Sequence, residues 1–255
     1  MYKEFVESFL FFPDTNIIDT PESFQIPFQD IFVSKKNSDN FSKTDKYHGW
    51  FMESKSPYVI LFFHGNAGNI STRISFFKKL YEQNLSILAF DYPGFGKSQG
   101  KATEESCHQA SLLFFHFLHY EKKYSHKNII LWGESIGGSL ATLLSLNTHS
   151  PSLVLQSTFT DIQEIIHKVA PKIPSFIYHS VGFETKKYLK KRYQLTKLNK
   201  EMKTLILHSR DDELIPYTHA EVLKKYANDL FECGGKHSSP KINEAFFKKI
   251  MNFLL

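Results

Sequence analysis

The stretch IILWGESIGGSLA, residues 129–141, decides the fold of this chain. It starts as an apolar run typical of a buried strand and continues as a run typical of a helix, with Ser135 at the junction. Gly133, Gly137 and Gly138 surround the serine and leave room for a turn too tight for side chains. Such a turn projects a serine hydroxyl above the sheet, so we predict that Ser135 is a nucleophile. The alternative is a glycine-rich turn without chemistry.

Apolar runs that alternate with helical segments surround this stretch. The runs that are apolar on both faces lie at 58–63, 85–90, 128–132, 152–157, 204–209 and 229–233. The segments with helical periodicity lie at 71–83, 103–123, 135–147, 217–227 and 241–255. Two earlier strand-like runs, at 24–33 and 47–53, are joined by a polar segment and predict an antiparallel hairpin at one edge. We therefore predict an α/β fold with a mostly parallel eight-stranded sheet and helices on both faces.

The length of the chain fits one domain of this class. We predict a single domain over residues 1–255, with a large core because 42% of the residues are hydrophobic. About fifty residues separate the sixth and seventh predicted strands, far more than a simple connection needs. This stretch, at about 160–202, is a candidate lid over the sheet.

A serine nucleophile needs a base, and the base needs a carboxylate to orient it. Among twelve histidines we favour His237, which follows the last predicted strand through two glycines. Two adjacent aspartates follow the preceding predicted strand, and of these we choose Asp212, with Asp211 in reserve. The carboxyl ends of parallel strands meet at one edge of a sheet, so these side chains are expected to gather near Ser135. For most of the histidines, a surface position is the simpler interpretation.

Acyl transfer also needs backbone donors for the developing oxyanion. The N–H of Ile136, next to the serine, is expected to supply one donor. The stretch FFHGNAGNIS, residues 62–71, forms a glycine-rich turn after the first buried strand, and Asn66, or else Ala67, is expected to supply the other. This loop lacks the glycine patterns of nucleotide-binding sites, although it could simply reverse the chain.

Composition limits the other functions of the chain. A formal net charge of +5 is a mild basic excess, so we expect no nucleic-acid partner. Cys107 and Cys233 lack the spacing of a disulfide framework or a zinc site, so we expect neither a metal nor another cofactor. The apolar stretch near the N-terminus is too short to span a bilayer and has no leader cleavage site. A cytoplasmic location is expected, while the oligomeric state is left open.

Several motifs together resemble the α/β-hydrolase superfamily. These motifs, in chain order, are SFLFFPD, TPESF, HGWF, FHGNAGN, DYPGFGKSQG, GESIGGSLA, STFTDI, HSRDDELIP and GGKH. More narrowly, the chain resembles the small serine hydrolases grouped with the bud-emergence protein of fission yeast and the mammalian α/β-hydrolase-domain depalmitoylases.

The resemblance assigns roles to particular residues. It implies that Ser135, Asp212 and His237 form the triad, and that Asp91 and Tyr92 organise the oxyanion turn. Only a few residues precede the FFPD element, where many relatives carry a hydrophobic anchor, and the cysteine-rich N-terminus of the depalmitoylases is absent. Both departures argue against membrane anchoring and against a depalmitoylase role.

The residues and the resemblance together predict a serine hydrolase that cleaves esters or thioesters through an acyl-enzyme, with a small or lipid-like acyl substrate. The alternatives are a peptidase that releases amino acids and a non-catalytic binding protein that kept the fold. Residues 184–200 are strongly basic with interleaved tyrosine and leucine. A solvated helix face is the first interpretation of this segment. Weak docking on a membrane or on an acidic substrate is the second.

Overall fold

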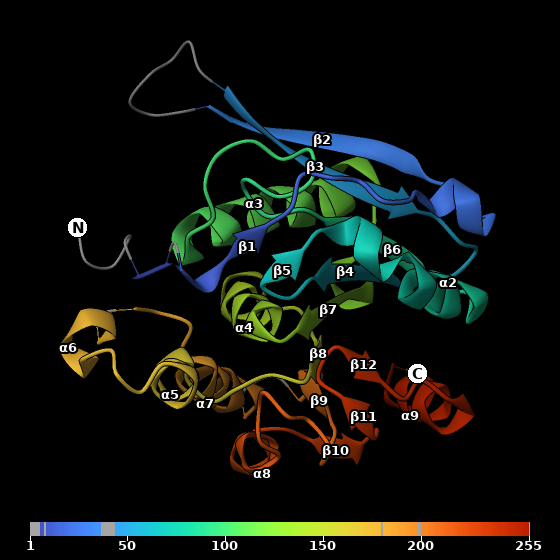
Figure 1. The fold of residues 1–255 in the computed structure, drawn as a ribbon. Coiled ribbons are helices and arrows are strands. Elements are labelled where there is room, and N and C mark those ends of the chain that lie inside the picture. The colour runs from blue at the N-terminus through green and yellow to red at the C-terminus, as the bar shows by residue number, and fades with distance from the viewer. Residues whose placement is uncertain (1–5, 8, 37–43, 180, 198–199, 255) are drawn as a thin grey trace. The chain divides into compact units, whose positions relative to one another are not determined.

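The computed structural model describes residues 6–7, 9–36, 44–179, 181–197 and 200–254. Its internal contacts group into two compact parts, a first part over Met1–Ile129 and a second part over Ile130–Leu255. Each part combines strands and helices (Figure 1). Within the described ranges, no helix is both long and apolar enough to cross a bilayer.

Four strands of the first part pair in the order β4-β6-β3-β2. Strand β2 (Gln29–Lys36) is antiparallel to β3 (Thr44–Met52), and β3 is antiparallel to β6 (Ser86–Phe90). Strand β4 (Val59–Phe63) is parallel to β6. Every residue of β4 and β6 is buried, as expected for strands that are apolar on both faces. The predicted edge hairpin and the first two predicted parallel strands are therefore confirmed.

The first part also contains helices and one short bridge. The helices are η1 (Pro21–Phe24), η2 (Ile70–Arg73), α2 (Ile74–Glu82), α3 (Glu104–His116), the π-helical turn η3 (Phe117–Glu121) and η4 (His126–Asn128). Strand β1 (Phe12–Pro13) pairs in parallel with β5 (Ala67–Gly68). A reciprocal pair of hydrogen bonds between Thr103 and Ser106 fixes the start of α3.

Two boundaries in the first part differ from the sequence prediction. The helix predicted over 71–83 opens with the 3-10 turn η2, because the Asn69 side chain accepts a hydrogen bond from the N–H of Ser71 and tightens the first turn. The strand predicted from residue 24 begins only at Gln29. Before it, Gln25 adopts a left-handed conformation with φ 60°, and Pro27 has no N–H to donate to a neighbouring strand.

Four parallel strands of the second part pair in the order β10-β9-β8-β7. They are β7 (Ile129–Glu134), β8 (Ser152–Gln156), β9 (Lys203–His208) and β10 (Asp229–Glu232). The short strands β11 (Gly235–Lys236) and β12 (Ser239–Pro240) form an antiparallel pair after β10. The order β9-β8-β7 brings three strand ends side by side. Ser135 follows β7, Asp212 follows β9, and His237 comes after β10 and β11.

Helices lie on both sides of these strands. They are α4 (Ile136–Thr148), α5 (Ile162–Val169), α6 (Ser175–Tyr178), α7 (Thr185–Thr196), α8 (Thr218–Lys224) and α9 (Glu244–Leu254). Figure 1 shows α4 and α7 on one side of β8 and β9, and α9 on the other side. The candidate lid contains α5, α6 and α7, and α7 packs against α4. Its action as a lid stays a prediction.

Arg192 attaches α7 to the strands of the second part. Its guanidinium donates to the carbonyls of Ser150 (2.8 Å), Pro151 (2.8 Å) and Lys203 (3.2 Å), and to the hydroxyl of Thr204 (3.3 Å). The side chain is fully buried, and burial lowers the pKa of Arg192 to about 9, so it stays charged at neutral pH. For residues 184–200 the sequence predicted a solvated helix face. The lysines of α7 are exposed as predicted, but Arg192 faces inward.

The substitution Arg192→Met is expected to destabilise the fold by about 2 to 4 kcal/mol, because it leaves buried carbonyl oxygens without a donor. Lys191→Met is the matched control. The Lys191 side chain is next in sequence to Arg192 but is exposed, so its loss should destabilise the fold by less than about 0.5 kcal/mol. Urea unfolding followed by circular dichroism measures both. Equal unfolding midpoints for the two variants would show that Arg192 does not hold α7.

Candidate active site

Ser135 lies between β7 and α4 in a conformation that side-chain-bearing residues rarely adopt. Its backbone has φ 55° and ψ −121°. The N–H of Ser135 donates to the carbonyl of Gln156 (2.9 Å). Its carbonyl accepts from the N–H of Gly138 (2.9 Å) and from the hydroxyl of Thr158 (2.7 Å). Neighbouring strand β8 and helix α4 therefore hold the strained backbone in place.

The glycines around Ser135 are required by close contact. A Cβ atom on Gly133 would lie 2.3 Å from the carbonyl oxygen of Gly137. A Cβ atom on Gly138 would lie 2.5 Å from the hydroxyl oxygen of Thr158. Both distances are too short for nonbonded atoms, so a side chain at either position would push β7, α4 or the Thr158 loop apart. The glycine-rich pattern in the sequence thus reflects how closely β7 and α4 approach each other.

His237 lies in the turn between β11 and β12. Gly235 opens this turn with φ 87°, and a Cβ atom there would lie 2.5 Å from the carbonyl oxygen of Ser239. The backbone N–H of His237 donates to Glu213 Oε2 (3.1 Å). This bond ties the histidine turn to the loop that follows β9.

Asp212 lies in the loop after β9 with its side chain fully buried. Its Oδ1 accepts from the N–H groups of Leu214 (3.1 Å) and Ile215 (2.7 Å). Burial raises the pKa of Asp212, but the hydrogen bonds that its carboxylate accepts from His237 and from the N–H of Ile215 outweigh this effect. The net pKa of Asp212 lies below its ordinary value, so the carboxylate is ionised at neutral pH.

The structure brings Ser135, Asp212 and His237 together. His237 Nδ1 lies 2.9 Å from Asp212 Oδ2 and 3.1 Å from Oδ1, and His237 Nε2 lies 3.2 Å from Ser135 Oγ. An ionised carboxylate only accepts, so Nδ1 carries the proton and Nε2 turns its lone pair toward the serine hydroxyl. The arrangement can remove a proton from Ser135 while Asp212 stabilises the imidazolium that forms.

The neighbouring aspartate is placed differently. Asp211 is exposed, and its backbone N–H donates to the hydroxyl of Ser209 (3.0 Å). Of the two adjacent aspartates, Asp212 is therefore the one that contacts His237. The turn that follows β9 buries one carboxylate and leaves the other in solvent.

The residues predicted for the oxyanion turn lie in both parts. Ile136 is the first residue of α4 in the second part. Asn66 and Ala67 follow β4 in the first part, where the carbonyl of Asn66 accepts from the N–H of Phe12 (2.8 Å). Their roles as donors stay predictions.

Asp91 and Tyr92 hold the loop after β4 at two points within the first part. Tyr92 Oη donates to the carbonyl of His64 (2.7 Å), before the loop. Asp91 Oδ1 accepts from the N–H of Ile70 (2.9 Å), after it. Both side chains are buried. The two side chains thus fix the loop after β4 at both ends, and their role in an oxyanion turn stays a prediction.

Two further residues contact the Asp212 loop, and sequence reasoning missed both. His208 Nε2 donates to the carbonyl of Ile215 (2.9 Å) and lies 3.5 Å from Asp212 Oδ2. Burial lowers the pKa of His208, so it is neutral. Lys168 Nζ donates to the carbonyls of Glu213 (3.2 Å) and Leu214 (2.9 Å). The position of His208 at the end of β9, four residues before Asp212, was a usable signal. Nothing in the sequence pointed to Lys168.

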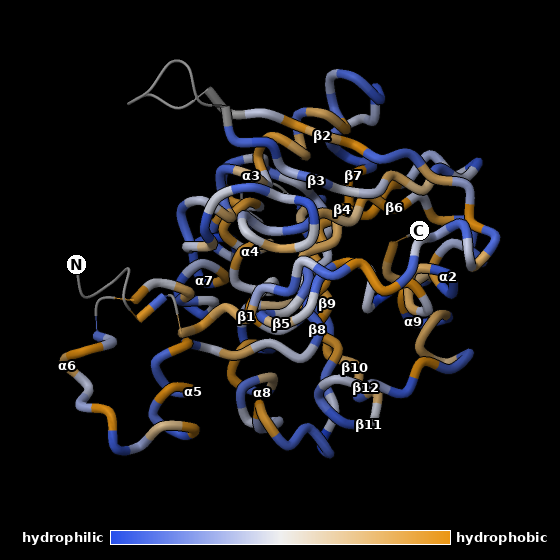
Figure 2. Tube along the Cα trace, turned by 45° about the horizontal axis from the view of Figure 1, so that its top comes forward, coloured by the Kyte–Doolittle hydropathy of each residue, from blue (hydrophilic) through white to orange (hydrophobic). Residues whose placement is uncertain are grey.

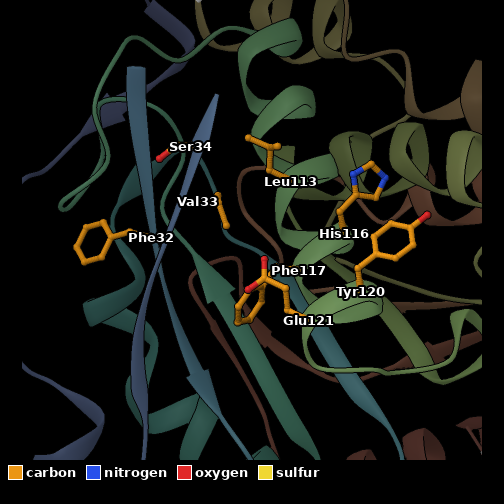
Figure 3. Close-up of a pocket in the computed structure, with 8 residues that line it drawn as sticks. All are labelled: Phe32, Val33, Ser34, Leu113, His116, Phe117, Tyr120 and Glu121. Carbon is orange, nitrogen blue, oxygen red and sulfur yellow. The ribbon is translucent and has the colours of Figure 1, made fainter. Parts of the chain in front are cut away.

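A hollow of about 310 Å³ lies elsewhere, in the first part. Figure 3 shows Val33 of β2 on the side of Leu113, His116 and Tyr120 from α3 and η3, while the ring of Phe32 points away from them. The residues predicted for the site do not line it. In the portion of the chain that the structure describes, no three His, Cys, Asp or Glu side chains gather where they could hold a metal ion.

Comparisons with known proteins identify relatives of this chain. Residues 54–229 match the family model described as "Serine aminopeptidase, S33". Protein bem46 of Schizosaccharomyces pombe is 26% identical over 250 residues, which cover 93% of this chain and 80% of bem46. The lysophosphatidylserine lipase ABHD12 of Xenopus tropicalis is 31% identical over 188 residues, which cover 66% of this chain and 47% of the lipase.

Solved structures show the same fold. The esterase Pf2001 of Pyrococcus furiosus superposes with a TM-score of 0.67 at 19% identity, covering 95% of this chain and 98% of the esterase. A family match over more than half of the chain, together with this architecture, establishes kinship. The chain is an α/β-hydrolase and belongs to the family described as "Serine aminopeptidase, S33".

Proposed function

We propose that this α/β-hydrolase cleaves carboxylic esters or thioesters through an acyl-enzyme on Ser135. The observation that carries the proposal is the relay from Ser135 Oγ through His237 to Asp212, with separations of 3.2 Å and 2.9 Å. The strained backbone of Ser135 is the second support, because it projects the hydroxyl out of the turn.

The reaction follows from these positions. His237 Nε2 takes the hydroxyl proton of Ser135 while Oγ attacks the substrate carbonyl carbon. The tetrahedral intermediate then collapses, its bond to the leaving oxygen or sulfur breaks, and the leaving group takes the proton from His237. Water, activated by His237 in the same way, hydrolyses the acyl-enzyme. Asp212 keeps Nδ1 protonated throughout and stabilises the positive ring.

Backbone N–H groups complete the proposed site. The N–H of Ile136 lies at the first turn of α4, where the helix dipole favours an anion. We assign it to the developing oxyanion, and Asn66 or Ala67 stays the sequence prediction for a second donor. Each such donor typically lowers the barrier by about 3 to 4 kcal/mol.

The relatives suggest the class of substrate and the alternative activity. ABHD12 is named as a lysophosphatidylserine lipase, and its likeness to this chain favours an acyl ester with a lipid-like tail. The family description names aminopeptidases, which favours amide cleavage as the second candidate function. Cys107 and Cys233 are buried free thiols, which fits the proposed cytoplasmic location.

Ser135→Ala is expected to abolish labelling by a fluorophosphonate probe and to lower p-nitrophenyl butyrate turnover by at least about a thousandfold, because no other group supplies the nucleophile. Ser139→Ala is the matched control, a second buried serine, located on α4. Peptide mass spectrometry of the labelled chain identifies the modified residue. Labelling of the Ser135→Ala variant at the wild-type rate would rule out this nucleophile.

Asp212→Asn is expected to lower turnover by about 10⁴-fold, because an amide no longer fixes the tautomer of His237. Asp211→Asn, which removes the exposed neighbouring charge, should stay within about threefold of the wild type. Initial rates on the same ester measure both. Similar losses in the two variants would contradict the assignment.

The Asp212→Asn variant also tests the lowered pKa of Asp212. A carboxylate with a lowered folded-state pKa stabilises the fold above its unfolded value of about 4, and this contribution is lost as pH falls through the folded value. Urea unfolding at a series of pH values should therefore show a gap between wild type and Asp212→Asn that is full at pH ~7 and shrinks below pH ~4.

Acyl esters and thioesters are expected to turn over at least about a hundredfold faster than aminoacyl amides with matched acyl groups. The comparison uses kcat/KM for p-nitrophenyl esters, acyl thioesters and aminoacyl p-nitroanilides over a range of chain lengths. Faster cleavage of the anilides would instead favour the aminopeptidase.

A further inference from the structure

Positive charge is concentrated in one segment of the second part. Residues 165–200 contain nine of the 31 Lys and Arg residues, and Glu184 is the one acidic residue among them. The rest of the sequence has 22 basic and 25 acidic residues, so its net charge is slightly negative. The formal charge of +5 therefore originates entirely in this segment, which corresponds to most of the candidate lid.

Large apolar side chains are exposed in the same segment. Val169, Ile173 and Phe176, at the end of α5 and the start of α6, are 58%, 42% and 75% exposed. We call residues 169–176 the apolar tip. Pro171 and Pro174 restrict its backbone. Figure 2 shows hydrophobic stretches interleaved with hydrophilic ones along the chain around α6.

Helix α7 carries four of these nine basic residues on one side. Its exposed lysines are Lys186, Lys187, Lys190 and Lys191, and with the exposed Lys197 that follows the helix they make up what we call the basic face. Leu189 and Arg192 are buried on the opposite side. The spacing of three and four residues places the lysines along one stripe of the helix.

Hydrogen bonds join the segments that carry α5, α6 and α7. Gln163 of α5 donates through Nε2 to the carbonyl of His179, directly after α6 (3.1 Å). The N–H of Lys186, at the start of α7, donates to the carbonyl of Thr160 (2.8 Å), just before α5. The three helices are therefore held as one unit rather than as independent segments.

We propose that the apolar tip and the basic face together dock on an anionic lipid bilayer. Apolar side chains enter the interface of a bilayer, and lysines near an anionic lipid surface are attracted to it. A nucleic acid or an acidic protein would use the lysines but would leave Ile173 and Phe176 in water. The combination of exposed apolar and basic side chains thus favours lipid over the other anionic partners.

The docking surface is joined to the loop of the candidate active site. Lys168, the residue before the apolar tip, donates to the carbonyls of Glu213 and Leu214, the two residues that follow Asp212. Docking would hold the site close to the bilayer surface, where a lipid-like acyl substrate is concentrated. The docking itself depends only on the surface side chains and stands independently of the proposed hydrolysis.

Vesicle sedimentation tests the proposal with the full chain. The probes are vesicles of phosphatidylcholine alone and vesicles with about 30% phosphatidylserine. We expect binding to the anionic vesicles only, and its loss in about 0.5 M salt, where charge attraction is screened. Ile173→Ser combined with Phe176→Ser, and Lys186→Gln combined with Lys190→Gln, should each weaken partitioning by about tenfold or more.

Matched controls keep the test specific. Phe32→Ser removes an exposed phenylalanine of the first part, which is 51% exposed, and Lys101→Gln with Lys248→Gln removes two exposed lysines outside the lid. These controls should sediment like the wild type. The docking variants and their controls should keep wild-type turnover of soluble p-nitrophenyl butyrate. Ser135→Ala, which loses this turnover, should sediment like the wild type, so a failure of docking is distinguishable from a failure of hydrolysis.

Three results would overturn the proposal. The first is no sedimentation of the wild type with anionic vesicles. The second is normal sedimentation of the Ile173→Ser, Phe176→Ser variant. The third is binding to heparin that needs the lysines of α7 but not the apolar tip, which would identify a soluble polyanion as the partner.

Discussion

The candidate site depends on the backbone conformation of Ser135. A φ of 55° is energetically unfavourable for a residue that has a side chain, so the surrounding structure must impose this conformation on Ser135. The contacts come from the carbonyl of Gln156, from the hydroxyl of Thr158, and from α4, which approaches β7 closely enough to require Gly133. Strand pairing and helix packing in the second part thus hold the strain at the position where a reactive hydroxyl would be exposed.

The other two residues of the relay are fixed by different means. Asp212 is buried and held by N–H groups of its own loop, whereas His237 lies in a small hairpin that is anchored through Glu213. The acid and the base are therefore positioned by neighbouring loops that bind each other as well as the relay. His208, on β9, contacts the same loop by donating a hydrogen bond to the carbonyl of Ile215.

Much of the fold could be predicted from the sequence, because buried strands and amphipathic helices leave clear periodic patterns. The ends of elements were predicted less accurately where local features decide them. These features are the Asn69 side-chain hydrogen bond at η2, and the left-handed Gln25 and Pro27 before β2. For the site, Ser135, Asp212 and His237 could be placed at strand ends, and the structure brings them within hydrogen-bonding distance.

Contacts between segments far apart in the sequence were not predictable. Arg192 belongs to a run of lysines, and only the packing of α7 on α4 shows that it points inward to carbonyl groups. Lys168 looks like any surface lysine until α5 is placed beside the Asp212 loop. Both are long-range polar contacts, and no periodic pattern in the sequence indicates them.

The central claim is that Ser135, served by His237 and Asp212, is the nucleophile of an acyl-transfer site. A crystal structure of the chain inactivated with a phosphonate ester tests it most directly, because the adduct mimics the tetrahedral intermediate. The account predicts phosphorus bonded to Ser135 Oγ and a phosphonyl oxygen accepting from the N–H of Ile136, with His237 still bound to Asp212. An adduct on any other side chain, or His237 turned away from Ser135, would contradict it.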